Sequence, residues 1–201
     1  MLLAREGSQG KLLSAFGQAQ RQFEAGRKMP TDLGITGSTF RAYRNCGGSP
    51  SATFRSWATG EAYALINRRA VQNRKDFLKL HGELASSLSA HWSRTGLRNL
   101  TVAEKYKIVD LFVKAVAFTS AHPSEKEREA LYHYGNIPLD KFSLIAIDSL
   151  FYGIVVNPTP SMGHIRDEQT YGFLQDQIYR LTQATNIPNL VFDHYAWNLT
   201  H

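Results

Sequence analysis

Residues 99–118 read NLTVAEKYKIVDLFVKAVAF, a run in which apolar side chains recur at helical spacing. One side of the helix would carry Val102, Tyr106, Val109, Phe112, Val113 and Val116. Thr101, followed three residues later by Glu104, forms a capping-box pattern, which marks a helix start. The stretch therefore predicts an amphipathic helix from Thr101 to about Phe118. Lys107 and Lys114 lie two turns apart along one side of it.

Similar patterns extend through the rest of the chain. Apolar periodicity predicts further helices over residues 11–25, 61–70, 74–93 and 168–184. Asn73 and Ser124 precede two helical runs as candidate N-caps, and the run after Ser124 is short and strongly charged. Pro138 fits the first turn of another helix, which would bring Asp140 close to that helix's N-terminus.

Two segments lack a helical pattern over most of their length. Residues 30–60 are rich in Gly, Ser, Thr and Pro, which predicts long loops around a short helix at Thr39–Arg44. Residues 152–163, YGIVVNPTPSMG, favour an extended connection because two prolines follow the paired valines. The expected fold class is all-α, with a flexible N-terminus at 1–10 and a single helical domain over 11–201. Two helical lobes around one cleft are the alternative arrangement.

Composition narrows the function classes. The 201 residues include 23 basic and 17 acidic side chains, a net charge of +6, which is typical of proteins that contact phosphates. No apolar run is long enough to cross a bilayer, and the start lacks a signal-peptide pattern, so we expect a cytoplasmic protein without a membrane partner. The single cysteine, Cys46, excludes an internal disulfide and a multi-cysteine zinc site. No metal or nucleotide-cofactor motif is present, and no cofactor is expected.

The positive charge is concentrated in one window. Between Arg41 and Lys79 there are eight basic residues against Glu61 and Asp76. The candidate DNA contacts in this window, together with Lys114 further along the chain, are Arg41, Arg44, Arg55, Arg68, Arg69, Arg74 and Lys75. These residues predict a basic face that binds duplex DNA. A well-solvated helical surface without a polyanionic partner is the other interpretation.

Two short segments carry a family resemblance. In AEKYKIVD, residues 103–110, a small residue precedes Lys107 by four positions, and Ile-Val-Asp follows the lysine. In NIPLDKFSLIAI, residues 136–147, Asp140 follows Ile-Pro-Leu at the head of a predicted helix. Together these segments resemble the helix-hairpin-helix DNA glycosylases, in particular their 8-oxoguanine branch. The resemblance covers about a quarter of the chain and implies that Lys107 and Asp140 are catalytic.

The sequence also departs from that family. Asn99-Leu100-Thr101-Val102 stands where the family has a glycine-containing hairpin that binds a phosphate. The sequence separation of Lys107 and Asp140 is 33 positions, which exceeds the family's spacing by about one short helix. The charged run after Ser124 could supply that helix. Relatives of this kind also remove hypermodified bases, including glucosylated ones, from phage DNA. An enlarged loop region would suit a bulky base of that type.

The chemistry of glycosidic bond cleavage explains why these two residue types matter. As the base departs, positive charge builds on the sugar, and a carboxylate such as that of Asp140 can stabilise it. In the resembling enzymes the lysine at the place of Lys107 attacks the sugar as a free amine and forms a Schiff base. Water as the nucleophile is the alternative, with Asp140 orienting it. The non-catalytic interpretations are that Asp140 only caps a helix and that Lys107 is a surface lysine.

A flipped base needs aromatic faces and a few polar groups around it. The candidates for such a base pocket are Tyr43, Trp57, Phe192, Asp193 and Trp197. The aromatic members are equally compatible with the hydrophobic core. The sequence thus supports a DNA glycosylase that acts on a flipped base in duplex DNA. The alternatives are a non-catalytic helical nucleic-acid-binding or regulatory protein, and a helical toxin or partner-binding subunit that uses its aromatic C-terminus as an interface.

Overall fold

The computed structural model describes residues 4–26, 28–29, 31–119, 124–152 and 160–200. Within these ranges the protein is compact and all-helical, and one β-bridge pairs Ala4 with Phe151. The α-helices are α1 (Ser8–Ala25), α2 (Gly37–Phe40), α3 (Pro50–Trp57), α4 (Tyr63–Arg68), α5 (Arg74–Ser93), α6 (Val102–Phe118), α7 (Glu125–Tyr134), α8 (Lys141–Leu150), α9 (Glu168–Ala184) and α10 (Val191–Thr200). The 3₁₀ segments are η1 (Arg41–Cys46) and η3 (Met162–His164), and the π-helical turn η2 covers Ala58–Ala62.

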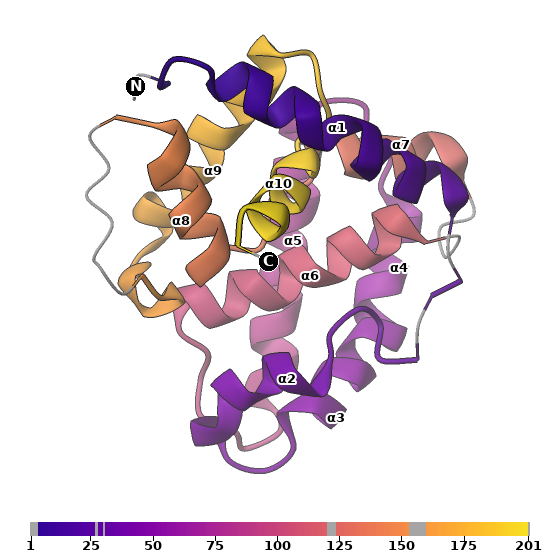
Figure 1. Ribbon diagram of the computed structural model, residues 1–201. Helices are drawn as coiled ribbons and strands as arrows, with labels where there is room; N and C mark the ends of the chain where they lie inside the picture. Colours follow the sequence, from indigo (N-terminus) through magenta and orange to yellow (C-terminus); the bar gives the residue numbers. More distant parts are fainter. Residues whose placement is uncertain (1–3, 27, 30, 120–123, 153–159, 201) are drawn as a thin grey trace.

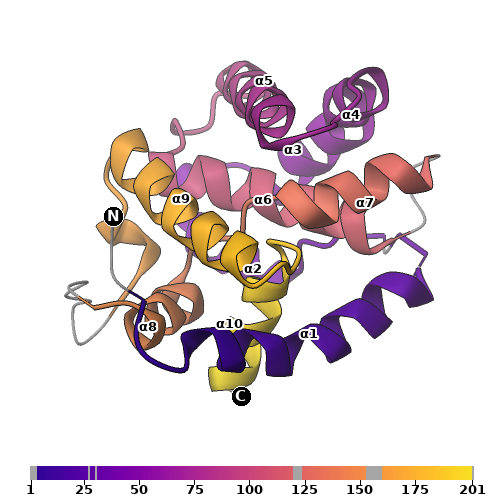
Figure 2. The same ribbon diagram turned by 90° about the horizontal axis from the view of Figure 1, so that it is seen from above.

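Helix α6 runs through the middle of the molecule (Figure 1). Seen from above, α3, α4 and α5 lie on one side of α6, and α1, α8 and α10 lie on the other (Figure 2). Ile108, Val109, Phe112, Val113 and Val116 of α6 are completely buried. A helix that is covered on two sides needs apolar residues around much of its circumference, and the run 108–116 supplies them.

The buried apolar side chains form one continuous core around α6. Phe112 of α6 makes an edge-on contact with Trp57 of α3 at 5.5 Å between ring centroids, and Phe23 of α1 stacks on Tyr132 of α7 at 4.4 Å. Aromatic pairs in these geometries contribute about 0.5–1.5 kcal/mol each beyond their burial. The described helices therefore share one core, with no second apolar cluster between two lobes.

Side-chain caps define several helix starts as the sequence predicts. Asn73 accepts a hydrogen bond from the Asp76 amide at 3.0 Å, so α5 begins at the expected residue. At α6, Thr101 and Glu104 form the reciprocal capping box, with Glu104 Oε2 accepting from the Thr101 amide at 2.8 Å. Ser124 accepts from the backbone of Glu127 and caps α7. These caps satisfy amides that a helix leaves without partners in its first turn.

Three expectations differ from the structure. The first helix, α1, begins at Ser8, three residues before the predicted start at 11, and the Arg5 amide donates to the Leu150 carbonyl at 2.7 Å. The window 30–60 contains α2, η1, α3 and most of η2, since aromatic side chains there reach the core despite the turn-forming residues around them. Pro138 precedes α8 and is not within its first turn. The segment 153–159, most of the expected extended connection, lies outside the described residues.

Candidate functional site

Lys107 of α6 and Asp140, the residue before α8, lie next to each other. Lys107 Nζ donates a hydrogen bond to Asp140 Oδ2 across 3.1 Å. The other carboxylate oxygen, Oδ1, accepts from the backbone amides of Phe142 at 2.9 Å and Ser143 at 3.3 Å. Asp140 is therefore the N-cap of α8, where the helix places partial positive charge beside the carboxylate. One carboxylate serves both the helix and the lysine because each uses a different oxygen.

Buried amide side chains hold the segment that precedes Asp140. Gln175 of α9 accepts from the Ile137 amide at 3.2 Å and donates to the Ile137 carbonyl at 2.7 Å. Asn189 donates to the Gly135 carbonyl at 2.6 Å. Residues 135–139 are buried and lie outside any helix, and the ring of Pro138 disfavours a helical conformation at Ile137. The position of Asp140 is thus set by α9 and the turn before α10.

The pair lies in the wall of a cavity of about 590 Å³, the Lys107–Asp140 cavity. Helix α6 contributes Lys107, Leu111 and Lys114 along one side. Helix α10 contributes Asp193 and Trp197, which are four residues apart and therefore lie on the same face of that helix. The remaining wall comes from the segment Gly34–Arg41 and from the start of α8. Four separate parts of the chain meet in this cavity.

The charged groups of the cavity are largely paired. Besides the Lys107–Asp140 pair, Lys114 Nζ donates to Asp193 Oδ2. Arg41 is exposed, and its Nε makes a long contact of 3.4 Å to the Ser38 carbonyl. Three cationic side chains against two carboxylates leave the cavity with a net positive charge, which favours an anionic ligand such as a nucleic-acid phosphate.

An aromatic side chain stands beside the charged pairs. The ring of Trp197 is 55% exposed although it lines the cavity, and it meets the ring of Phe142 edge-on at 6.1 Å between centroids. An indole face on the rim of a basic cavity can stack on a planar heterocycle, and such stacking contributes about 1–3 kcal/mol per base in single-strand binding proteins. The cavity therefore combines a carboxylate, cations and a stacking surface.

Behind the cavity, a buried polar cluster fixes the orientation of α6. Asp110, completely buried, accepts from Tyr171 Oη at 2.9 and 3.0 Å and lies 2.7 Å from His81 Nε2. Burial raises the pKa of Asp110, and the hydrogen bonds from His81 and Tyr171 oppose that shift. Because the cluster joins α5, α6 and α9, it fixes α6 at Asp110, three residues after Lys107.

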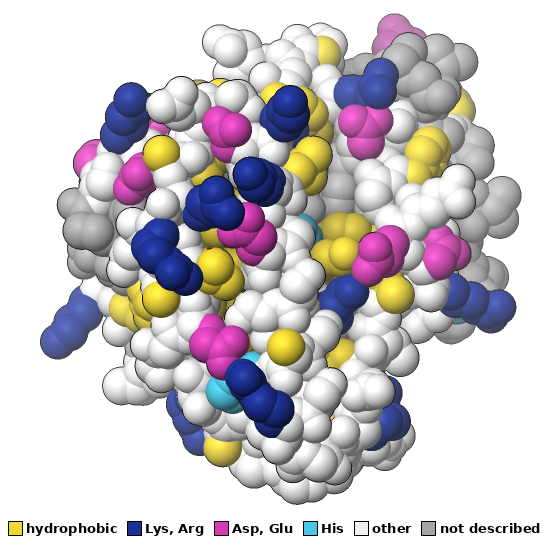
Figure 3. Space-filling view, turned by 180° about the vertical axis from the view of Figure 1, so that it is seen from behind, with side chains coloured by type: hydrophobic (Ala, Val, Ile, Leu, Met, Phe, Trp, Pro, Cys, Tyr) yellow, Lys and Arg dark blue, Asp and Glu magenta, His cyan; other side chains and the backbone are white. Residues whose placement is uncertain are grey.

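The basic residues of the 41–79 window do not form one face. Arg41 and Lys114 line the cavity, whereas Arg68 lines a groove between α4 and α5, on the far side of α6 from α8 and α10 (Figure 2). Arg69 is paired with Glu83, and Arg74 is half-buried over the rings of Phe77 and Tyr179. Arg44, Arg55 and Lys75 are exposed. Seen from behind, Lys and Arg side chains are interspersed with Asp and Glu (Figure 3).

Some of the base-pocket candidates line the cavity, and the others are buried in the core. Asp193 and Trp197 line the cavity. Tyr43, Trp57 and Phe192 are completely buried in the core and cannot receive a base. The polar atoms of the first two are also used inside the fold, since Tyr43 Oη donates to the Glu104 carbonyl at 3.0 Å and Trp57 Nε1 donates to Ser87 Oγ at 3.1 Å. Their helices have one buried face, and these aromatic side chains occupy it.

Several residues of the site have no signal in the sequence. Gly34, Thr36 and Ser38 line the cavity from a segment predicted as a loop, and Thr39 lies at the start of the predicted short helix. Gln175, which holds the segment before Asp140, reads as one more polar residue of α9. The four-residue spacing of Asp193 and Trp197 links two cavity residues because it places them on one face of a helix, as the seven-residue spacing does for Lys107 and Lys114.

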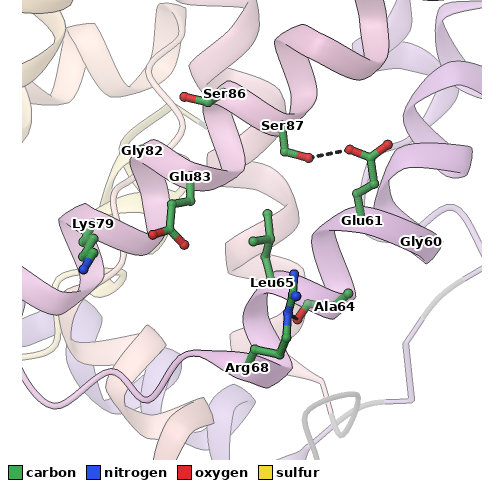
Figure 4. Close-up of a pocket in the computed structure, with 10 residues that line it drawn as sticks. All are labelled: Gly60, Glu61, Ala64, Leu65, Arg68, Lys79, Gly82, Glu83, Ser86 and Ser87. Carbon is green, nitrogen blue, oxygen red and sulfur yellow. Dashed lines mark hydrogen bonds between the residues drawn. The ribbon is translucent and has the colours of Figure 1, made fainter.

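A groove of about 850 Å³ lies between α4 and α5 (Figure 4). Its two carboxylates are used within the fold, since Glu61 accepts from Ser87 and Arg94, and Glu83 pairs with Arg69. No aromatic side chain lines it. The groove therefore offers no surface on which a base could stack.

No family model, curated protein or solved structure matches this chain. In the part of the chain that the structure describes, no group of His, Cys, Asp and Glu side chains could hold a metal ion. No described helix has both the length and the apolar character that crossing a bilayer requires. Function is therefore inferred from the geometry of the Lys107–Asp140 cavity.

Proposed function

We propose that the protein is a DNA glycosylase, which cleaves the N-glycosidic bond of a damaged or modified base and leaves an abasic site. The observation that carries the proposal is the 3.1 Å contact between Lys107 and Asp140 inside a cavity that also presents Arg41 and the exposed ring of Trp197. An amine beside a carboxylate, a phosphate-binding cation and a stacking ring are the groups that this reaction needs.

In the proposed reaction the C1′–N bond breaks, and its electron pair leaves with the base, which takes up a proton. Positive charge develops on the sugar, and the carboxylate of Asp140 stabilises it from a position fixed by the amides of α8. The oxygen of a water molecule then bonds to C1′ and releases a proton. Asp140 can orient that water because each carboxylate oxygen has two lone pairs, and Oδ2 is shown to use one of them for Lys107.

Lys107 has two roles open to it within this reaction. As observed, it donates a hydrogen bond to a carboxylate, and an ammonium group in that role stabilises charge but does not attack carbon. If the ammonium group loses a proton, the free amine can attack C1′ and displace the base, which leaves with the electron pair of the C1′–N bond. Loss of a proton from the new amine and opening of the sugar ring at O4′, which gains a proton, then give the Schiff base. The ion pair favours the first role, in which water is the nucleophile and the enzyme has no lyase activity.

Substitution of Asp140 tests the proposal. Asp140→Asn keeps an oxygen to cap α8, so the free energy of unfolding should fall by about 1 kcal/mol, the contribution of a partly buried ion pair. Base release should fall by about a hundredfold or more because the charge that stabilises the transition state is lost. Asp167→Asn is the matched control, since Asp167 caps α9 in the same way and does not line the cavity. Equal activity losses in the two variants would contradict the proposal.

A trapping experiment separates the two roles of Lys107. Borohydride reduces a Schiff base to a stable protein–DNA adduct, so an adduct that disappears in Lys107→Gln would assign the amine as nucleophile. Lys105→Gln is the control, because Lys105 is on the same helix but pairs with Glu168 at 2.8 Å outside the cavity. Base release without any adduct would assign water as the nucleophile.

A non-catalytic nucleic-acid-binding protein is the second candidate, and one observation favours it. Asp140 already has a structural use as the cap of α8, and both cavity lysines are paired with carboxylates. In that case Asp140→Asn would leave DNA affinity unchanged, and neither the wild-type protein nor the variant would release a base from any duplex. Release of a base by the wild-type protein excludes this candidate.

A further inference from the structure

A second cavity of about 290 Å³, the side chamber, adjoins the Lys107–Asp140 cavity. The two share Gly34, Lys114 and Asp193 in their walls. The Lys114–Asp193 ion pair therefore stands at the boundary between them. Lys114 is two helical turns from Lys107, about 10 Å along α6, which is comparable to the length of a nucleoside. A nucleotide whose sugar lies at Lys107 would thus reach the boundary with its base.

The walls of the side chamber suit a planar heterocycle. Ala115, Phe118 and Leu190 form an apolar lining. Gln22 of α1, His194 of α10, Lys28 and Thr119 add polar groups to it, next to the shared Lys114–Asp193 pair. Mostly apolar walls with a few convergent polar groups are typical of small-molecule sites. The Lys107–Asp140 cavity, by contrast, is lined by three cationic side chains and several hydroxyl groups.

His194 is the unusual residue of the side chamber. Its Nε2 is buried and has no hydrogen-bond partner among the described residues. Burial lowers the pKa of His194, and the nearby Lys114 lowers it further, so the ring is neutral at pH 7 and has one donor and one acceptor nitrogen. A buried polar atom without a partner costs about 1–3 kcal/mol. By turning about its Cβ–Cγ bond toward a bound ligand, the ring could recover that hydrogen bond.

We propose that the side chamber receives the hydrogen-bonding edge of the flipped base, and that Gln22 and His194 determine which base is released. This inference rests on the proposed glycosylase function and assigns specificity to residues outside the Lys107–Asp140 pair. The amide of Gln22 and the neutral imidazole each present a donor and an acceptor. They therefore favour a base edge that carries a carbonyl or hydroxyl oxygen next to an N–H group.

The first test measures base selectivity. Gln22→Leu and His194→Leu keep similar volumes and remove the hydrogen bonds, and Gln20→Leu is the control on the same helix, outside both cavities. In duplexes that differ in one base, the two chamber variants should change the ratio of kcat/KM between the best and second-best bases by tenfold or more. Binding to a duplex with a tetrahydrofuran abasic analogue, which has no base, should stay within twofold of wild type. The inference would be overturned if kcat/KM fell equally for all bases, or if binding to the duplex with the abasic analogue fell in parallel.

The second test does not depend on catalysis. Free DNA bases and their oxidised, methylated and hydroxymethylated forms would be tested for binding by saturation-transfer NMR. A base that binds the wild-type protein should bind Gln22→Leu and His194→Leu at least tenfold more weakly and Gln20→Leu unchanged. Such binding without base release would support the side chamber and reject the glycosylase. Base release with unchanged selectivity in both chamber variants would support the glycosylase and reject the side chamber.

Discussion

Tyr171→Phe should strongly destabilise the protein, because the hydroxyl of Tyr171 is the centre of the buried cluster behind α6. That hydroxyl donates to Asp110, lies 3.3 Å from His81 Nε2, and accepts from Asn136 Nδ2 at 2.9 Å. Burial and the adjacent Asp110 both raise the pKa of Tyr171, so the phenol remains protonated and able to donate. The substitution removes one oxygen atom and leaves the ring in place.

The size of the effect follows from the groups that lose a partner. A hydrogen bond to a charged group such as Asp110 contributes about 1.5–3 kcal/mol, and a buried amide left without a partner costs about 1–3 kcal/mol. Asn136 is especially sensitive, because its Oδ1 already has no partner among the described residues. The combined loss in the free energy of unfolding is roughly 3–5 kcal/mol.

Urea unfolding followed by circular dichroism measures this loss. With a slope of about 2 kcal/mol per molar, the midpoint should fall by roughly 2 M urea. Tyr132→Phe is the matched control, since Tyr132 is equally buried but its Oη has no hydrogen-bond partner among the described residues. That substitution should be neutral or slightly stabilising. If Tyr171→Phe were no more destabilising than Tyr132→Phe, the assignment of the cluster as an anchor of α6 would be refuted.

Gly34→Ala should lower the melting temperature, because Gly34 has φ +80° and an added Cβ would collide with Ala115 Cβ; the free energy of unfolding should fall by about 2 kcal/mol or more, and Ala115→Gly in the same chain should recover part of it. Burial lowers the pKa of His133, so the unfolded chain binds a proton more readily than the folded protein as the pH falls below about 6.5. The free energy of unfolding in urea should therefore decrease between pH 7.5 and 5.5, and less so in His133→Gln. Arg41→Glu should weaken DNA binding in fluorescence anisotropy more than Arg68→Glu, since only Arg41 lines the Lys107–Asp140 cavity; the reverse order would place the DNA on the α4–α5 groove.

Local patterns in the sequence determined the fold class and most helix bounds. The caps at Asn73, Thr101 and Ser124 are short-range features, since each side chain bonds an amide three residues ahead. Glycine at residue 26 ends α1 in a left-handed conformation, as its lack of a Cβ allows. The window 30–60 was harder to predict, because α3 begins at Pro50 among turn-forming residues and is stabilised by burying Phe54. There tertiary packing outweighed local propensity.

The residue types at positions 107 and 140, a helical lysine and a carboxylate at a helix start, are features that the sequence determined by itself. Their contact across 3.1 Å was decided by tertiary structure, since 33 residues and one whole helix separate them along the chain. Tertiary structure also decided which aromatics are accessible: Trp197 reaches the cavity, whereas Tyr43 and Trp57 fill the core. The physical reason is that capping and periodicity act within one or two turns, whereas a cavity forms where several helices pack together.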